Sequence, residues 1–363
     1  MTDRLYADIH VLQTVPPSCV NRDDTGSPKT AVYGGVTRAR VSSQAWKKAV
    51  RDMFRETLPK EDVGVRTKRI QAMVANELSG QGYLGDAGEA AKAILEKAGL
   101  ASKSVDAGSA APLFFMSPAQ AKALARLVLD DRDADKKAAR GALNAAPSID
   151  IALFGRMVAD DATLNIDASC QVAHAISTHR VQNEFDYFTA VDDFPSEDKT
   201  DAGAAMMGTV EYNSSTLYRY ATVAVHELRV QLGDADTAAN AVKAFTDAFT
   251  RSMPNGKINT FANRTPPDAV YVALRTDRPL NLVGAFELPV AAKERGTAKD
   301  QGYVSASSEA LVKKANDVRK WALPPAVSYT VDGLLNGIAG VEAVETFDIL
   351  LDKLGGKTAA LLR

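Results

Sequence analysis

The stretch Thr37–Leu58, TRARVSSQAWKKAVRDMFRETL, joins a short strand to a helix and sets the expected fold. Thr37–Val41 predicts the strand, and Ser42 or Ser43 is a suitable N-cap for a helix that runs to about Leu58. Apolar residues recur along this helix at the spacing of one buried face: Trp46, Ala49, Val50, Met53 and Phe54. The stretch therefore predicts a helix that packs against a core.

A second face of the same helix is basic. Lys47, Arg51 and Arg55 lie four residues apart, with Gln44 and Lys48 beside them, so they form a ridge about 12 Å long at the helical rise. Between residues 38 and 69 ten Lys or Arg accompany only four acids, giving +6, whereas the whole chain carries −2 and the remainder therefore −8. The ridge is either a solvated helix face or a polyanion-binding surface, and the scarcity of acids favours the second.

The composition is that of a globular protein with enough apolar material for a core. The chain has 363 residues, of which 46% are hydrophobic and 24% charged, and its length predicts about two compact units. Cys19 and Cys170 have no metal-ligand spacing and form no disulfide framework, so a reducing, cytoplasmic setting is expected. No apolar run reaches the ~18 residues of a membrane span, and the first residues lack a signal-peptide pattern. We therefore expect no membrane partner.

The rest of the chain mixes strands and helices, which predicts an α+β fold. The expected elements are strands at Tyr6–Leu12, Ser148–Met157, Tyr212–Val225 and Ala269–Leu274, an Ala-rich helical insertion at about 60–145, helices at about 234–252 and 306–322, and loops at Val15–Gly35 and Val181–Glu211. Ala168–Arg180 fits a strand or a helix. The second loop, an extended segment or hairpin, carries Phe185, Tyr187 and Phe188, which either contact a partner or fold back onto the core.

Two motifs suggest a cofactor or a metal but lack the required context. Gly80-x-Gly82-x-x-Gly85 matches a dinucleotide fingerprint, which needs a preceding strand, whereas the preceding segment is helical in pattern. Cys170, His174 and His179 have the spacing of possible metal ligands, but no fourth ligand accompanies them. We therefore expect a loop at the glycines and a structural role for the histidines, with no cofactor and no metal.

The sequence gives equally little indication of a catalytic site. No G-x-S-x-G string occurs, and Cys19 lacks the surroundings of a cysteine nucleophile. The pairs Asp23–Asp24 and Asp192–Asp193 could hold Mg²⁺ for phosphodiester cleavage, but adjacent aspartates in such loops usually form turns and caps. What remains is a basic helix and a distant aromatic loop, the combination that RNA binding uses for phosphates and unstacked bases.

The chain resembles a known family through strings that occur in order from about residue 8 to about residue 222. These strings are Ile9-His10-Val11-Leu12, Pro17-Ser18-Cys19-Val20-Asn21-Arg22-Asp23-Asp24, Tyr33-Gly34-Gly35, Arg40-Val41-Ser42-Ser43-Gln44, Lys47-Lys48, Asp150-Ile151-Ala152-Leu153-Phe154-Gly155-Arg156-Met157, Ala173-His174-Ala175-Ile176-Ser177-Thr178-His179, Phe188-Thr189-Ala190-Val191-Asp192-Asp193 and Leu217-Tyr218-Arg219-Tyr220-Ala221. They resemble the CasC family, RAMP-superfamily proteins that form the backbone of the type I-E CRISPR Cascade complex. The similarity is weaker after residue 222.

The resemblance implies a hand-like protein with a ferredoxin-like, RRM-type palm. The palm is expected at 1–59, 171–180 and 212–363. A helical insertion is expected to form the fingers at 60–170, and a β-hairpin is expected to form the thumb at 181–211. Copies are implied to stack along a crRNA, with each thumb folding over the RNA and displacing a nucleotide. The other nucleotides then stay free to pair with target DNA.

The resemblance also implies an RNA-binding set. Phosphate and sugar contacts are implied for Arg22, Lys29, Gln44, Lys47, Lys48 and Arg51, a wedge against the bases for Met157, and contacts with the displaced nucleotide for Tyr187, Phe188 and Thr189. Arg40, Ser42 and Arg156 complete the set. The helix ridge contains four of the six phosphate-binding residues, and such contacts position a strand without reading its sequence.

The function implied is that of a structural subunit and not of an enzyme. The implied partners are crRNA, target DNA through the guide, further copies of the chain, and the large, small, crRNA-processing and 5′-handle-binding subunits. An alternative is a metal-dependent ribonuclease of the RRM-type superfamily, which would use Asp23 with Asp24 or Asp192 with Asp193. A third possibility is a monomeric module that binds single strands without ordered stacking.

Overall fold

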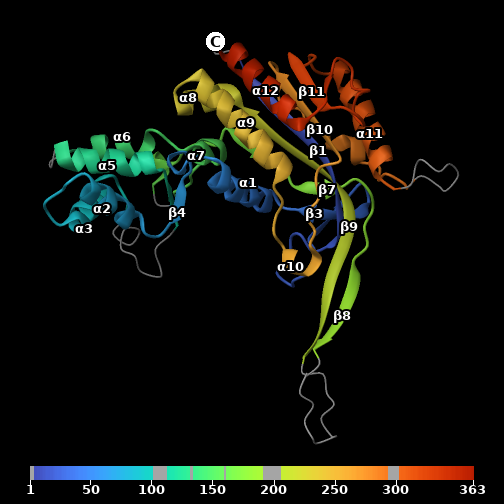
Figure 1. The fold of residues 1–363 in the computed structure, drawn as a ribbon, viewed down its shortest axis with the longest axis horizontal. Helices are drawn as coiled ribbons and strands as arrows, with labels where there is room; N and C mark the ends of the chain where they lie inside the picture. Colours follow the sequence, from blue (N-terminus) through green and yellow to red (C-terminus); the bar gives the residue numbers. More distant parts are fainter. Residues whose placement is uncertain (1–3, 101–112, 131–133, 159–160, 191–205, 293–301) are drawn as a thin grey trace, which may run out of the picture.

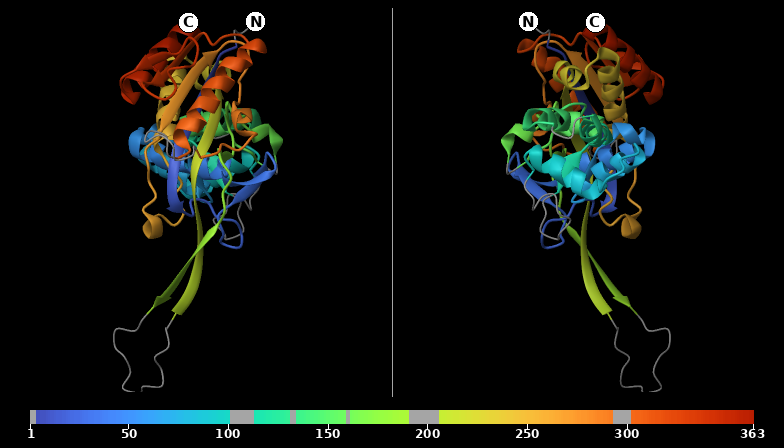
Figure 2. Two further views of the ribbon diagram at one scale, coloured as in Figure 1. Left: turned by 90° about the vertical axis from the view of Figure 1, so that its right-hand side faces the viewer. Right: turned by 90° about the vertical axis from the view of Figure 1, so that its left-hand side faces the viewer.

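The computed structural model describes residues 4–100, 113–130, 134–158, 161–190, 206–292 and 302–363. A large sheet with helices on both faces forms the body, a group of short helices projects to one side, and a two-stranded ribbon extends from one end (Figure 1). Figure 2 shows this ribbon leaving the body at the end opposite to the chain termini. The expected α+β class is confirmed.

The sheet is built around β1 (Tyr6–Ser18), which pairs antiparallel with β9 (Met206–Ala224) and β10 (Ala269–Arg275). Its order is β12-β11-β10-β1-β9-β7-β3-β2, and β6 and β8 also pair with β9. The other strands are β2 (Thr30–Tyr33), β3 (Val36–Val41), β6 (Cys170–Val172), β7 (Ala175–Ser177), β11 (Val327–Val331) and β12 (Glu342–Val344). The segment left open at residues 168–180 is therefore two short strands, and β1 and β2 extend into the predicted loop at 15–35.

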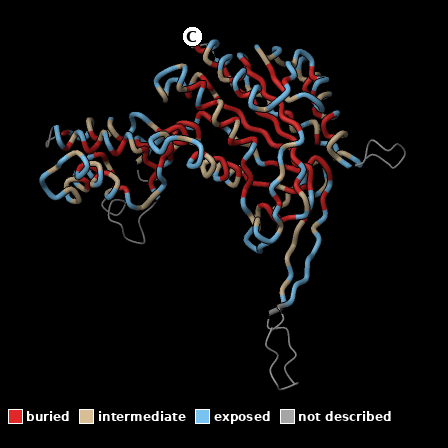
Figure 3. The backbone as a smooth tube through the Cα atoms, in the orientation of Figure 1, coloured by how far each residue is buried: buried red, intermediate tan, exposed pale blue. Residues whose placement is uncertain are grey.

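Both faces of β1 are covered, because successive side chains of a strand point to opposite faces. Ile9 and Val11 pack with one set of helices, and Leu12 packs with another. The first set consists of α1 (Ser43–Thr57), α8 (Val225–Leu232), α9 (Ala235–Arg251) and α12 (Phe347–Leu362), and the second of α11 (Val304–Asp317) with the short turns η3 (Val283–Phe286) and η4 (Val318–Lys320). Figure 3 shows the resulting buried layer through the body.

The projecting helices have a core of their own, in which Ile70, Leu95 and Leu124 are buried. After the turn η1 (Lys60–Asp62) it consists of β4 (Val65–Thr67), α2 (Ile70–Gly80), α3 (Ala87–Lys97), β5 (Phe114–Met116), α5 (Pro118–Asp130), α6 (Lys136–Asn144) and η2 (Ala162–Leu164). We call these elements the helical module. Gly80 ends α2, so a helix precedes the glycine motif, as the sequence predicts, where a dinucleotide fingerprint requires a strand.

The strand predicted at Ser148–Met157 is wrong. The structure forms α7 (Ile149–Phe154) there, with Ser148 at the N-cap position and Gly155 ending the helix at φ 76°. A short apolar run does not distinguish a buried strand from a buried helix. The positive φ at Gly155, which glycine adopts without steric cost, sets the direction of the chain beyond α7.

The ribbon pairs β8 (Glu184–Ala190) with the first part of β9, in register from Glu184 opposite Tyr212 to Ala190 opposite Met206. The second half of β9 continues into the sheet beside β1, so one long strand serves both parts. The ribbon is consequently anchored in the central sheet. Residues 191–205, including Asp192 and Asp193, lie outside the described residues.

A buried polar pair lies on the α11 face of β1. Asp8 accepts hydrogen bonds from the Tyr220 hydroxyl and the Leu280 N–H, both at 2.9 Å, and burial raises its pKa to about 6. His10 contacts the Tyr218 hydroxyl at 2.8 Å, and burial lowers the pKa of its imidazole to about 3. Burial therefore shifts the pKa of each group in the direction that favours its neutral form.

These two shifts predict opposite effects of pH on stability. Below pH 6.5 the unfolded chain protonates His10 and the folded chain does not, so acidification to about pH 3 destabilises the protein through His10. Between pH 6 and 3.8 the folded chain protonates Asp8 and the unfolded chain does not, so acidification stabilises the protein through Asp8. Asp8→Asn removes the second effect. We expect its unfolding free energy to fall by about 1 kcal/mol between pH 6.5 and 5 relative to the parent's change, measured by urea denaturation. If the unfolding free energies of parent and variant change equally with pH, the pKa of Asp8 is not raised in the folded protein. His10→Gln removes the first effect, so its unfolding free energy should rise relative to the parent's change over the same range.

Candidate nucleic-acid interface

Helix α1 forms as the sequence predicts. Ser42 is its N-cap, with a side-chain oxygen that accepts from the Ala45 N–H at 3.3 Å, and its own N–H donates to Asn21 at 2.9 Å. Trp46, Val50 and Phe54 are buried. The helix is thereby fixed against the sheet and presents its polar side outward.

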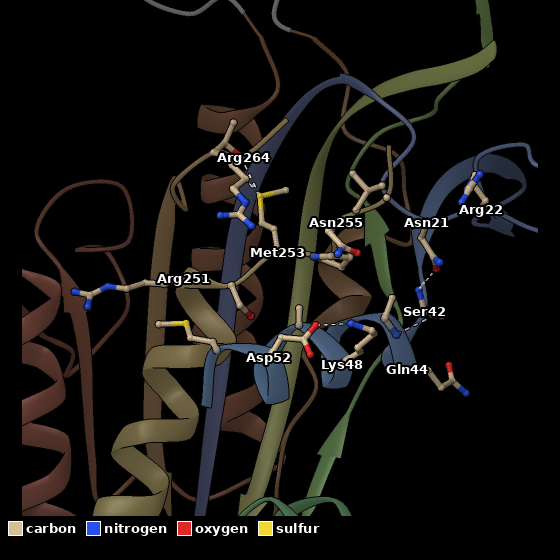
Figure 4. Close-up of a pocket in the computed structure, with 18 of the residues that line it drawn as sticks. Asn21, Arg22, Ser42, Gln44, Lys48, Asp52, Arg251, Met253, Asn255 and Arg264 are labelled. Carbon is tan, nitrogen blue, oxygen red and sulfur yellow. Dashed lines mark hydrogen bonds and ion pairs between the residues drawn. The ribbon is translucent and has the colours of Figure 1, made fainter. Parts of the chain in front are cut away.

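A groove of about 1220 Å³ runs beside α1. Its first bank consists of α1 and the loop after β1, including Arg22, Gln44 and Lys48, and its second bank consists of residues 251–256 with Arg264 and Thr265. Figure 4 shows Lys48 and Gln44 on the first bank, and Met253, Asn255 and Arg264 on the second. Four predicted residues line this groove: Arg22, Ser42, Gln44 and Lys48.

The first bank carries a compact group of charges. Lys48 Nζ lies 2.5 Å from Asp52, and Arg55 Nη1 lies 3.0 Å from the same carboxylate. All three side chains are more than one third exposed, so the pairs are screened and each stabilises the fold by about 1 kcal/mol or less. Arg22 is exposed and makes no ion pair within the described part of the chain. Asp23, Asp24 and Glu56 also line this bank, so its cations stand among carboxylates. Because the ion pairs are weak, these cations can still turn to a polyanion at small cost to the fold.

Arg51 departs from the expectation of a free cation on the ridge. Its side chain is only 11% exposed, and Nε donates to the buried Asp150 carboxylate at 3.0 Å. The guanidinium also lies 4.3 Å from the centre of the Phe115 ring. Arg51 joins α1 to the helical module, so its charge is already matched, and we do not include it among the groove cations.

The expectation that Arg156 contacts RNA disagrees with its position. Its side chain is buried and donates to the Leu164 carbonyl at 2.9 Å and to Asn144 Oδ1 at 2.8 Å. Burial lowers the pKa of its guanidinium to about 10. The neighbouring Met157 is 84% exposed. Arg156 therefore stabilises the helical module from inside, and Met157 is the residue of this turn that is free to contact a partner.

The other predicted residues lie away from the groove. Arg40 donates to the Thr30 carbonyl at 3.0 Å and lies 3.2 Å from His174. The pKa of this imidazole is lowered first by burial and then by the charges of Arg40 and Lys29, so these two cations share one region. Lys47 Nζ lies 5.6 Å from the centre of the Phe154 ring. The cations thus form separate patches around α1.

The aromatic residues predicted to contact a nucleotide lie on the ribbon. Tyr187 is 62% exposed, and its hydroxyl lies 2.9 Å from Met207 Sδ. The Phe188 ring covers Gly208 on the paired strand, where an added Cβ would come within 2.5 Å of it. Thr189 is exposed next to it. The structure brings these residues together with each other but does not place them in the groove.

Among the possible metal ligands and catalytic aspartates, His179, Cys170 and Asp23 have local structural surroundings. His179 stacks on Tyr303 at 3.6 Å between ring centres and contacts the Thr216 N–H at 3.1 Å, and Cys170 is buried. Asp23 Oδ1 accepts from the Thr25 and Ser27 N–H groups at 3.0 Å, as expected of a turn former. Within the described ranges, no group of three or more His, Cys, Asp or Glu could hold a metal ion.

Sequence reasoning missed the second bank of the groove. Asn255 and Arg264 belong to a loop after α9 that carries no charge run or motif, and the folding of the chain brings it opposite α1. The one local signal is the string Pro254-Asn255-Gly256, which predicts a turn. Arg251, on the same bank, is paired with Asp247 and Asp348 at 3.0 and 2.5 Å.

The fold and the groove together define an α+β protein with a cation-bearing groove beside its sheet, a separate helical module and a protruding ribbon. The chain belongs to the CT1975-like protein family, whose model matches residues 7–347. This match confirms the resemblance found in the sequence at the level of the family. None of the helices in the described ranges is both long and apolar enough to span a membrane.

Two solved structures are similar over nearly the whole chain. One, described as "CRISPR RNA-guided surveillance complex, pre-nicking", contains a chain that is 32% identical with a TM-score of 0.76, covering 97% of this chain and 100% of that one. Another, described as "CRISPR RNA-guided surveillance complex", is 28% identical with a TM-score of 0.62 and coverages of 97% and 99%. No curated protein matches the chain.

Proposed function

We propose that this chain is a crRNA-binding backbone subunit of a type I-E Cascade complex in the cytoplasm. Several copies stack along the guide RNA and present it for pairing with target DNA in antiviral defence. The large, small, crRNA-processing and 5′-handle-binding subunits complete the assembly. The observation that carries the proposal is the groove beside α1, with Arg22 and Lys48 exposed in a chain whose full-length structural relatives belong to RNA-guided complexes.

The parts of the molecule fit the proposed hand-like organisation. We assign the palm to 1–59, 171–180 and 212–363, the fingers to 60–170 and the thumb to 181–211. The separate core of the helical module and the pairing of β8 with β9 support this division. The exposed side chains of Met157 and Tyr187 support contacts with bases from the fingers and the thumb.

We further propose that the subunit is not catalytic. Asp23 is engaged by the N–H groups of its own turn, which favours a structural role over metal binding. The ribonuclease alternative is tested by incubating RNA with the purified chain and Mg²⁺. Cleavage that is lost in Asp23→Ala with Asp24→Ala, while binding is unchanged, would replace the proposal by that alternative.

Purification from cells that express the partner subunits and a CRISPR array tests the proposed function directly. The bound nucleic acid is sized and sequenced. RNA of uniform length with repeat and spacer sequence, in a particle far larger than the 38.7 kDa chain, is the expected result. A nucleic-acid-free monomer in the presence of the partner subunits would overturn the proposal.

Asp52→Asn should strengthen RNA binding. The substitution removes the carboxylate shared by Lys48 and Arg55, so both cations become available to phosphates. We expect about three- to tenfold tighter binding at low salt, and a smaller gain at high salt because exposed charges are screened. Fluorescence anisotropy with a labelled single-stranded RNA measures the change. Asp317→Asn, which releases Lys320 at η4 on the opposite face of the sheet, is the matched control, and an equal gain there would mean that overall charge decides.

A further inference from the structure

The loop that carries the second bank of the groove is held in an unusual conformation between Gly256 and Arg264. Residues Ile258–Phe261 form the short helix α10, and the residues at its two ends, Lys257 and Ala262, have left-handed φ angles of 44° and 47°. Non-glycine residues in this region cost about 1–3 kcal/mol each, and such strain concentrates at binding sites. The loop thus keeps its shape against a local backbone preference.

Contacts with the body hold both ends of this loop. At one end, Gly256 lies so close to the loop after β1 that an added Cβ would come within 2.1 Å of the Val20 carbonyl oxygen. At the other, Gln13 Nε2 donates to the Thr265 carbonyl at 2.8 Å, and the Thr265 hydroxyl donates to the Thr14 carbonyl at 2.7 Å. The loop is therefore fixed relative to the first bank of the groove.

The attachment continues into the interior. Gln13 Oε1 accepts a hydrogen bond from Arg219 at 2.6 Å. The Arg219 guanidinium is buried and lies 3.7 Å from the centre of the Trp46 ring of α1. One connected set of contacts consequently sets the positions of α1 and of the loop, so the width of the groove is determined by the fold.

The loop presents a guanidinium that the fold does not use. Arg264 lines the groove and is exposed, and the structure gives it no hydrogen bond or ion pair among the described residues. Asn255 is exposed on the same bank (Figure 4). Arg251 nearby differs, because two aspartates already pair with it. Arg264 is thus the available cation of the second bank.

Both banks of the groove carry cations. Arg22 and Lys48 line the first bank, and Arg264 lines the second. A ligand that fills the groove meets positive charge from both sides. A phosphodiester chain suits this arrangement, because its charges repeat along its length and guanidinium groups bind phosphate oxygens in pairs.

We infer that Arg264, with the side-chain amide of Asn255, binds the phosphodiester backbone of a single-stranded nucleic acid from the bank opposite α1. The inference rests on the proposed function and extends it, because the strand is then held between two fixed banks and not on one helix face. An acidic protein segment is the competing occupant, and the test below separates the two.

Arg264→Gln tests the inference in the full chain. We measure anisotropy of a labelled, mixed-sequence single-stranded RNA over a series of salt concentrations. We expect about tenfold weaker binding at low salt and a salt slope reduced by about 0.7, the value for one phosphate contact in a single strand. Arg319→Gln is the matched control, since Arg319 is exposed at η4 on the opposite face of the sheet, and it should bind like the parent.

The outcomes distinguish the inference from the proposed function. Binding of Arg264→Gln equal to the parent, while a variant of the first bank loses binding, overturns the inference and leaves the proposed function in place. A parent chain that binds no RNA overturns both. If Arg264→Gln loses binding to a polyglutamate probe and keeps binding to RNA, the groove takes an acidic protein segment and the inference is wrong. Unchanged thermal unfolding of the variant shows that the fold is intact.

Discussion

Replacing Asp150 by Ala is expected to lower the free energy of unfolding by about 3–5 kcal/mol, as removal of one partner of a buried ion pair does. The carboxylate is fully buried, and its two oxygens accept from the Gly64 N–H and the Ser148 hydroxyl at 2.7 Å and from Arg51 Nε at 3.0 Å. Without it, a guanidinium and a backbone N–H are left unpaired in the interior. The loss follows from these unmet groups more than from the pair itself.

The position of the ion pair between Arg51 and Asp150 determines which measurement should detect the loss of stability. Asp150 belongs to α7, which connects the helical module with the sheet, and the two parts have separate cores. Both tryptophans, Trp46 and Trp321, lie outside the helical module. Tryptophan fluorescence in urea therefore reports on the sheet, and far-ultraviolet circular dichroism reports on all helices. We expect the midpoint of the dichroism transition to move further than that of fluorescence.

A double substitution is the control for Asp150→Ala. Arg51→Met with Asp150→Leu removes both charges and should recover part of the lost stability, because no unpaired charge is left although the Gly64 N–H still lacks an acceptor. Recovery by the double variant would identify the unpaired guanidinium as the cause. A single variant as stable as the parent would show that the buried contacts of Asp150 contribute little.

The same residues show how far the sequence alone predicts this molecule. Helix α1 was predictable with its cap because its apolar spacing, its Ser42 cap and its basic face are all local. The pairing of Arg51 with Asp150 joins residues 99 positions apart, and no local pattern indicates which cation on a ridge meets a buried carboxylate. For the same reason the sequence did not indicate that Arg156, included in the RNA-binding set, is enclosed by five acceptors of the helical module.

Only the first bank of the groove could be predicted from the sequence. Arg22, Gln44 and Lys48 belong to segments with recognisable composition and family strings, whereas Arg264 follows α10 in a loop without pattern. A groove is formed by the meeting of distant segments, and the register between β1 and β9 and the contacts of Thr265 with β1 decide that meeting. Those are tertiary contacts, and no local sequence pattern predicts them.

Charge reversal on the first bank is expected to have the largest effect on binding. Arg22→Glu with Lys48→Glu removes two exposed cations of the groove and introduces two carboxylates there. Two phosphate contacts account for about 1.4 of the salt slope on a single strand, and repulsion adds to their loss. We expect RNA affinity to fall by about a hundredfold or more, measured by anisotropy and by the RNA that copurifies with the assembled complex.

The fold should tolerate this change. Lys48 is 67% exposed and loses only the screened pair with Asp52, and Arg22 makes no ion pair within the described ranges, so stability should change by about 1 kcal/mol or less. A reversal at Lys47 and Arg51, the obvious choice from the helix ridge, is a poorer test. A glutamate at position 51 would meet the buried Asp150, so any loss of RNA would combine unfolding with lost contacts.

A control with the same change of charge separates local contact from overall repulsion. Arg319→Glu with Lys320→Glu alters the charge equally at η4, which follows α11 on the opposite face of the sheet from α1. If RNA is lost only in the Arg22 and Lys48 variant, the groove beside α1 is the binding surface. Equal losses in both variants would show that net charge alone decides, and full retention in both would mean that the RNA lies elsewhere on the molecule.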